Sequence, residues 1–151
     1  MGASGPHFSD SELQCRGTNC SADRLHGCGV NGCQQSLVEA LERFRELAGK
    51  PVLVNDAYRC KIHNAEVGGV GKSEHMEGLA ADIRVEGLTA GELERIALKI
   101  HEIRGIGRAD HKKYLHIDVR PTPTLAHWCY GFHGEVVPYY TTPESVGPIN
   151  A

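Results

Sequence analysis

The sequence has no long hydrophobic run, few aromatic residues and no excess of positive charge. No apolar segment approaches the ~20 residues that a membrane-spanning helix needs, so we expect no membrane span. The formal net charge is -3 at pH 7. A mildly acidic chain lacks the basic face with which non-specific nucleic-acid binders displace counterions, so we expect no nucleic-acid partner. The first ten residues contain no secretory signal, although a chain from which a signal had been removed would look the same.

The sequence does contain an unusual number of metal-binding side chains. Its 151 residues are 40% hydrophobic, which suits one globular domain with its own core. Disorder and a collagen-like repeat do not fit, because the hydrophobic fraction is too high and the glycines follow no period. Nine histidines and six cysteines are present, whereas aromatic residues make up only 6%. Imidazole and thiolate groups bind zinc and other transition metals, so this composition favours a metalloprotein.

We expect a single α+β domain in which helices pack against a small, mainly antiparallel sheet. Apolar residues recur at helical spacing over about 36–48 and 90–103. Each of these runs opens with a capping box, Ser36 with Glu39 and Thr89 with Glu92. Short strands are predicted near 52–55, 79–85, 105–108 and 114–120.

The same periodicity predicts how the chain is divided. Residues 1–34 form a cysteine-rich, irregular lead-in that belongs to the same domain, because they show neither helical nor strand spacing. Residues 35–133 form the core of the domain. Residues 134–151 form an irregular C-terminal tail, although a segment just before it, 128–132, could pack back on the sheet.

Three side chains are suited to a catalytic zinc site. His75 and Asp82 are too far apart in sequence to share one helical turn, so they would converge through a turn around Gly78 that runs into a strand. His116 would arrive from a neighbouring strand. Two imidazoles and a carboxylate, with one position open for water, are a chemically suitable set for such a metal. The alternative interpretation leaves His75 solvated in a loop and Asp82 as the cap of a turn.

The chain resembles the zinc D-Ala-D-Ala carboxypeptidase family, which also includes many phage endolysins and whose fold recurs in Hedgehog signalling domains. The resemblance is carried by the spacing Ser73-x-His75-x-x-Gly78-x-Ala80-x-Asp82 and by His116-x-Asp118. It extends over roughly residues 8 to 130. Further segments follow the family's order: Phe8-Ser9, Gly49-Lys50-Pro51, Tyr58-Arg59-Cys60, Val67-Gly68-Gly69, Gly105-Ile106-Gly107-Arg108 and Trp128.

The resemblance implies roles for particular residues. His75, Asp82 and His116 would bind Zn²⁺. Arg59 would face the terminal carboxylate of the substrate, because its planar fork suits a bidentate contact. Ser73 would hydrogen-bond near the substrate or the ligand loop. The implied reaction is hydrolysis of a peptide bond by a zinc-activated water.

The general base is where the sequence departs from the family pattern. Several relatives have an acidic residue three positions before the last zinc histidine, where this chain has Lys113. The remaining candidates for a catalytic base are Asp118 and His111, followed by Asp110. Asp118 lies on the same strand face as His116, so it could act as the base or could instead orient His116.

The substrate implied by the resemblance is a peptidoglycan stem peptide, cleaved by a D,D-carboxypeptidase or an endopeptidase that acts as a monomer. An endolysin of a phage, made in the host cytoplasm and acting on the cell wall, is the favoured setting. A periplasmic or secreted bacterial enzyme whose signal has been removed is the other. The competing hypothesis is a binding module of the same fold that keeps zinc without catalysis.

The cysteines allow three states. Cys15, Cys20, Cys28 and Cys33, with His26 between them, could form a second, structural zinc site. Their spacings of four, seven and four intervening residues do not match the two-residue zinc knuckle. Disulfides are therefore the preferred prediction for a protein outside a reducing cytosol, and the resemblance implies that Cys60 pairs with an early cysteine. Free thiols are the third alternative.

Overall fold

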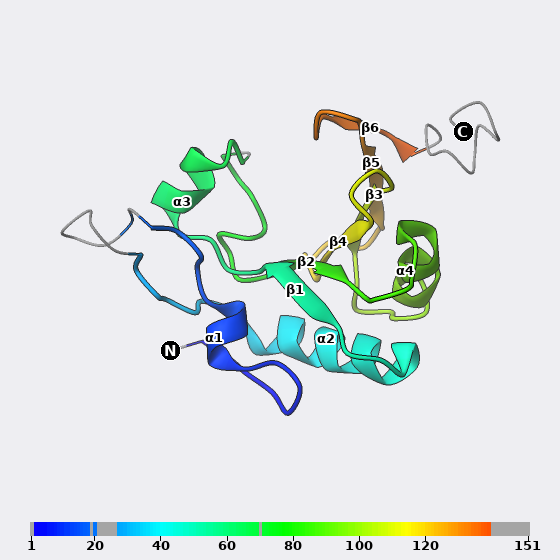
Figure 1. Cartoon of the computed structure of the whole chain (residues 1–151), viewed down its shortest axis with the longest axis horizontal. Coiled ribbons are helices and arrows are strands. Elements are labelled where there is room, and N and C mark those ends of the chain that lie inside the picture. Colours follow the sequence, from blue (N-terminus) through cyan, green and yellow to red (C-terminus); the bar gives the residue numbers. More distant parts are fainter. Residues whose placement is uncertain (1, 19, 21–26, 70, 140–151) are drawn as a thin grey trace.

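One six-stranded sheet organises the protein, in the order β1-β2-β4-β3-β5-β6 (Figure 1). The computed structural model describes residues 2–18, 20, 27–69 and 71–139. Strands β3 and β5 are parallel, and the other neighbours are antiparallel. The strands are β1 (Leu53–Asp56), β2 (Ala80–Arg84), β3 (Gly105–Ala109), β4 (Tyr114–Asp118), β5 (Ala126–Tyr130) and β6 (Val136–Pro138). The predicted single α+β domain with a mainly antiparallel sheet is confirmed.

Two longer helices, α2 (Gln35–Ala48) and α4 (Ala90–Ala97), cover one face of this sheet (Figure 1). Leu115 and Ile117 of β4 point toward them and are fully buried, because alternate strand residues face opposite sides. Each such side chain contributes roughly 1.5–3 kcal/mol when it leaves water. The core also contains Leu37, Leu41, Phe44, Ile83, Leu93 and Ile106. The other face of β4 is thereby left for polar side chains.

The helix ends differ from the sequence predictions. The box of Thr89 and Glu92 is confirmed at the start of α4. The predicted capping box of Ser36 and Glu39 is wrong. Helix α2 begins at Gln35, and its N-cap residue Gln34 makes no side-chain hydrogen bond to the helix. Helix α4 ends at Ala97 rather than near residue 103, because the following amides bond three residues back, as in Ile100 N–H to Ala97 O at 3.0 Å. The apolar spacing persists through these turns, so Ile100 is still buried.

Regular elements also occur in the two regions expected to be irregular. The lead-in contains α1 (Asp10–Leu13), which opens with a capping box of Ser9 and Glu12. The tail contains β6, and residues 140–151 lie outside the described residues. A further short helix, α3 (Lys61–Glu66), follows β1. No helix in the described part of the chain is long and apolar enough to cross a membrane.

Candidate metal centre

One row of paired residues crosses the polar face of the sheet. Asp82 of β2 is the register partner of Asp56 on one side and of His116 on the other. Continuing along the row, His116 pairs with Gly107, which pairs with Trp128. Because side chains of register partners project on the same side of a sheet, the antiparallel pairing alone places Asp82 beside His116.

Two glycines of β3 make room for this row. A Cβ on Gly107 would lie 2.5 Å from Nε1 of Trp128, and one on Gly105 would lie 2.1 Å from a carboxylate oxygen of Asp118. Both distances are too short for a Cβ atom, so neither position accepts a side chain without a shift of its neighbours. The Gly-x-Gly spacing of β3 therefore leaves the space that polar side chains of β4 and β5 occupy.

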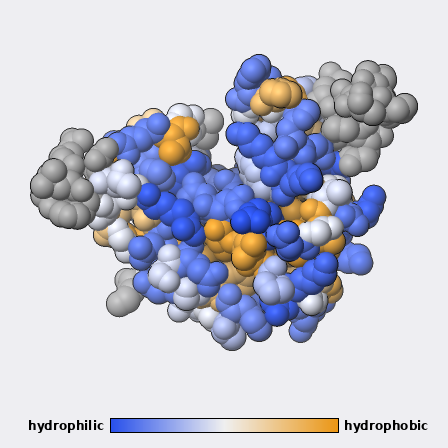
Figure 2. Space-filling view, viewed as in Figure 1, coloured by the Kyte–Doolittle hydropathy of each residue, from blue (hydrophilic) through white to orange (hydrophobic). Residues whose placement is uncertain are grey.

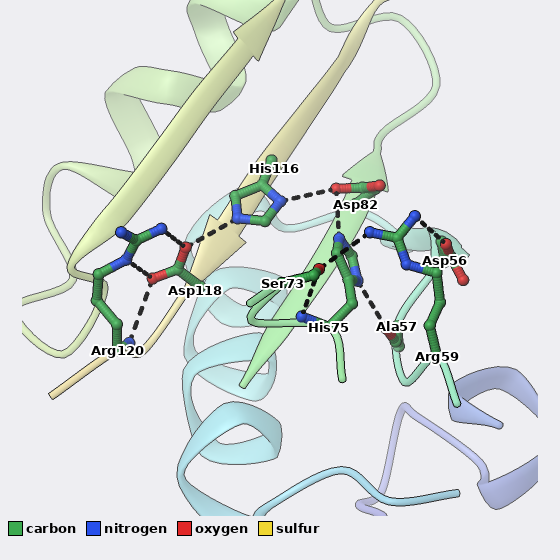
Figure 3. Close-up of polar contacts among 9 residues, drawn as sticks. All are labelled: Asp56, Ala57, Arg59, Ser73, His75, Asp82, His116, Asp118 and Arg120. Atoms are coloured by element: carbon green, nitrogen blue, oxygen red, sulfur yellow. Dashed lines mark hydrogen bonds and ion pairs between the residues drawn. The ribbon is translucent and has the colours of Figure 1, made fainter. Parts of the chain in front are cut away.

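His75 reaches the row from the loop before β2. Gly78 turns this loop with φ of +73°, and a Cβ there would lie 2.0 Å from the backbone oxygen of Gly32, so only glycine fits. The amide of His75 donates to Ser73 Oγ at 3.2 Å, and its Nδ1 bonds to the backbone oxygen of Ala57 at 2.6 Å. These two contacts hold the imidazole so that Nε2 points at Asp82 (Figure 3).

The three predicted ligands meet at one point. Asp82 Oδ1 lies 3.3 Å from His75 Nε2 and 3.1 Å from His116 Nδ1 (Figure 3). One ligand atom from each residue lies within 4.8 Å of the others. His75 and His116 are both buried, whereas Asp82 is partly exposed. The sequence prediction that a turn and a neighbouring strand bring these residues together is thus met by the structure.

The hydrogen bonds of His75 and His116 indicate that a cation would be stable beside Asp82. A backbone carbonyl only accepts, so His75 Nδ1 carries the proton in its bond to Ala57. His116 Nε2 likewise donates to the carboxylate of Asp118, at 2.8 Å. In neutral imidazoles the remaining nitrogens are lone-pair acceptors, and both face the Asp82 oxygen. Burial would lower the pKa of His116, but its hydrogen bonds to Asp118 and Asp82 raise this pKa to about 9, so positive charge is favoured here. A set of two nitrogens and one carboxylate fits zinc.

Asp118 lies on the far side of the His116 ring from Asp82 (Figure 3). It is fully buried and accepts from Nε and from a terminal nitrogen of Arg120, both at 2.8 Å. Burial alone would raise the pKa of Asp118, but the bonds from Arg120 and His116 hold it well below its usual range. The carboxylate is therefore ionised and directs the lone pair of His116 Nδ1 toward Asp82.

A pocket of about 380 Å³ opens over the three ligands. Figure 2 shows hydrophilic residues lining a notch between the part of the molecule that carries α3 and the part formed by β5 and β6. The pocket wall carries three cations, Arg59, Lys72 and Arg120, and the two tyrosines Tyr114 and Tyr130. Such a wall suits a substrate that carries negative charge and hydrogen-bond acceptors.

Both predicted substrate-binding residues are at this pocket. Arg59 donates to Ser73 Oγ at 3.2 Å and lies 3.5 Å from a carboxylate oxygen of Asp56 (Figure 3). Ser73 thus connects Arg59 to the amide of His75, since its hydroxyl contacts both. This pairing holds the guanidinium at the edge of the metal centre.

His111 and Asp110, the other candidates for the catalytic base, lie elsewhere, as does Lys113, which stands where relatives carry an acid. His111 sits in the exposed turn between β3 and β4, where its ring packs on Phe132 at 4.9 Å between centroids. Asp110 accepts from Arg108 Nε at 2.9 Å. Lys113 borders a separate hollow formed with the β2–α4 loop. None of these three is among the described residues that line the pocket over the ligands.

Sequence reasoning assigned no role to two groups on the pocket wall. Tyr114 shares the strand face of His116 and Asp118, so its position follows from the alternation already used for them. Glu74 directly precedes His75 and also lines the pocket. No local pattern separates Glu74 from a solvated loop residue, so only the tertiary structure shows that it borders the site.

The cysteines differ from what the sequence predicted. All six lie among the described residues and are free thiols, so the preferred disulfides are not found. The set that converges contains Cys60 in place of Cys33, with Cys15, Cys20 and Cys28. His26 lies outside the described residues.

Comparison with known proteins agrees with the geometry of the metal centre. A family model described as Peptidase M15 matches residues 6–118, which is most of the chain. No curated protein sequence matches the chain. The matched region contains all three convergent ligands together with Arg59, Ser73 and Asp118. The chain belongs to the peptidase M15 family, and its His75, Asp82 and His116 form a site that fits the zinc of a metallopeptidase.

Proposed function

We propose that the protein is a zinc peptidase that hydrolyses peptide bonds in peptidoglycan stem peptides, as an endolysin-type or related cell-wall enzyme. The observation that carries the proposal is the placement of Arg59 beside a two-histidine, one-carboxylate centre in a single pocket. His75, Asp82 and His116 would hold the metal. When bound, zinc supplies a Lewis acid and a water whose pKa is lowered to about 7.

The protein's own residues would bind and orient the peptide. Arg59 would pair its fork with a carboxylate of the substrate, such as the C-terminus that follows the scissile bond in a D-Ala-D-Ala peptide. Tyr114 would donate to the scissile carbonyl oxygen. Burial, together with the nearby Asp82 carboxylate, raises the pKa of Tyr114 to about 12, so this hydroxyl keeps its proton at neutral pH. A protonated phenol at this place is a ready hydrogen-bond donor for developing negative charge.

Asp118 would act as a positioning residue rather than as the base. Its two oxygens already accept from His116 and Arg120, and the imidazole ring separates it from the pocket. A carboxylate behind a metal-binding histidine sets the tautomer and orientation of the ring. This agrees with the second of the two roles that the sequence allowed for Asp118.

Glu74 would move the proton between the attacking water and the leaving amine. Apart from Asp82, it is the one carboxylate among the described residues on the pocket wall. The pKa of Arg120, another wall residue, is raised mainly by its hydrogen bonds to Asp118, and the charge of Glu74 adds to this effect. The Glu74 carboxylate is therefore close enough to Arg120, on the same pocket wall, to interact with its charge.

The activity itself is tested on purified peptidoglycan and on stem peptides that end in D-Ala-D-Ala. We expect metal-dependent cleavage that a chelator stops and added zinc restores. Release of free D-alanine identifies a carboxypeptidase, whereas new amino groups in cross-linked wall identify an endopeptidase. Blocking the peptide C-terminus as an amide should weaken a carboxypeptidase reaction, because Arg59 would lose its partner. No metal-dependent cleavage of either substrate would contradict the proposal and favour a non-catalytic zinc module.

The assignment of Glu74 predicts a separation of kcat from metal binding. Glu74→Gln should lower kcat by about 10²–10⁴-fold, since the amide cannot accept a proton, and should leave the zinc content unchanged. The exposed neighbour Glu77 provides the matched control, and Glu77→Gln should retain wild-type kcat. Asp118→Asn should instead weaken zinc binding as well as activity, by about 10–100-fold. A larger loss of kcat in His111→Ala than in Glu74→Gln would contradict the assignment.

A further inference from the structure

Four cysteines from two distant parts of the chain converge away from the peptidase pocket. Cys15, Cys20 and Cys28 come from the N-terminal lead-in, and Cys60 is the N-cap residue of α3. Their four Sγ atoms all lie within 4.8 Å of one another. Cys15 is buried and the other three are partly exposed. The remaining two cysteines, Cys33 and Cys129, are not part of this group.

Two of the sulfur–sulfur distances match the edge of a tetrahedral site. Cys15 Sγ lies 3.9 Å from Cys20 Sγ and 3.7 Å from Cys60 Sγ. Zinc–sulfur bonds of about 2.3 Å place the corners of a tetrahedron about 3.8 Å apart. Two disulfides would instead draw the four sulfurs into two pairs, each about 2 Å apart. Cys15 is nearly equidistant from two partners, which suits a shared central ion.

Backbone amides donate to two of the four sulfur atoms. The amide of Cys28 donates to Cys20 Sγ at 3.1 Å, and the amide of His63 donates to Cys60 Sγ at 3.4 Å. Such N–H donors stabilise negative charge on sulfur. These hydrogen bonds form because the loops around the cysteines turn tightly enough to bring backbone amides to the sulfur atoms.

Two glycines permit that tight path. A Cβ on Gly17 would lie 2.8 Å from Cys20 Sγ, and a Cβ on Gly27 would lie 1.9 Å from the backbone oxygen of Gly17. The second contact is with backbone, which cannot swing away as a side chain can. Side chains at these two positions would therefore force the loop apart and separate Cys20 from Cys15 and Cys60.

We propose that Cys15, Cys20, Cys28 and Cys60 bind a second Zn²⁺ as a closed, structural site. Soft thiolates in a tetrahedral S₄ set select zinc among the common divalent ions. Each thiol releases its proton to water as the metal binds, so all four sulfurs become ligands and no position is left for a substrate. Since Arg59 immediately precedes Cys60, this ion would tie the N-terminal lead-in to the segment that carries Arg59.

Zinc stoichiometry tests the site without reference to catalysis. Metal analysis of the wild-type protein, purified under reducing conditions, should give two zinc ions per chain. Cys60→Ser should give one, and His75→Ala should also give one, because the two variants empty different sites. Cys33→Ala and Cys129→Ala are the matched controls and should keep two. A single wild-type zinc that Cys60→Ser retains and His75→Ala loses, or iron in place of the second zinc, would overturn the proposal.

Cobalt substitution identifies the ligands of the second ion directly. Cobalt bound by four thiolates gives intense sulfur-to-metal charge-transfer bands in the near ultraviolet, which nitrogen and oxygen ligands do not produce. We expect these bands in the wild-type protein and in His75→Ala, so the result does not depend on Cys60→Ser folding. Their absence from both proteins would overturn the thiolate site, whatever the peptidase assay shows. Their presence in an inactive protein would instead contradict only the proposed function.

Discussion

Replacing His75 with alanine should abolish peptide hydrolysis and lower the zinc content by one ion per chain. The imidazole supplies one of three convergent ligand atoms, and the two that remain, from Asp82 and His116, do not complete a catalytic zinc site. The fold should persist, because His75 lies in a loop at the polar face of the sheet and outside the apolar core. Activity on peptidoglycan, metal analysis and circular dichroism of the same preparation measure the three outcomes.

His101 provides the control for this substitution. It is an exposed histidine in the turns that follow α4, so His101→Ala should keep both wild-type activity and wild-type zinc content. Replacement of His116 by alanine should reproduce the loss seen with His75→Ala, since both nitrogens face the same oxygen of Asp82. Full activity in His75→Ala would contradict the assignment of the metal centre.

Replacing Glu94 with alanine should lower the free energy of unfolding by about 3 kcal/mol, because it removes one of the two carboxylates that pair with a buried arginine and leaves only Asp110. Glu94 and Arg108 are each only 4% exposed, and their side chains meet at 3.0 Å. The other oxygen of Glu94 bonds to His127 at 2.8 Å, and Tyr139 donates to the first oxygen at 2.8 Å. One carboxylate thus connects α4 to β3, to β5 and to the residue after β6.

Thermal and denaturant unfolding measure this effect. For a domain of this size each kcal/mol corresponds to about 2–4 °C in Tm, so we expect Tm to fall by about 10 °C. Glu102→Ala, at an exposed position, should change stability by less than about 0.5 kcal/mol. The triple variant Glu94→Leu with Arg108→Met and Asp110→Asn should recover part of the loss, because it removes all three charges of the network together. A Glu94→Ala protein as stable as the wild type would show that the network contributes nothing.

The three residues of the candidate metal centre could be predicted because their geometry follows from local rules. Alternation along β4 places His116 on the polar face, and antiparallel pairing then sets it beside Asp82. The glycine turn before β2 brings His75 to the same place. The two long helices could also be predicted from the spacing of apolar residues. The exception is the end of α4, because Ile100 continues the apolar spacing through turns that are no longer α-helical.

Other parts of the site depend on contacts between distant residues. Strand alternation placed Asp118 beside the candidate metal centre, but the bonds from Arg120 and the position of the His116 ring decide that it faces away from the pocket. Nothing in the sequence around His111 indicates that its ring packs on Phe132 instead of over the ligands. Similarly, the pairing of β5 with β3 brings Trp128 into the row of the site without any apolar alternation along β5.

The abundance of histidine and cysteine in the sequence by itself determined that metal chemistry is to be expected, and the motif around His75 determined where one ion fits. Only the tertiary structure decided which cysteines converge. Cys60 joins Cys15, Cys20 and Cys28, which precede it by more than thirty positions. Spacing along the chain predicts contacts within a helix, strand or turn, because backbone geometry repeats there. It cannot predict which loops meet, because that depends on how the whole core packs and on the turns that glycines such as Gly17 permit.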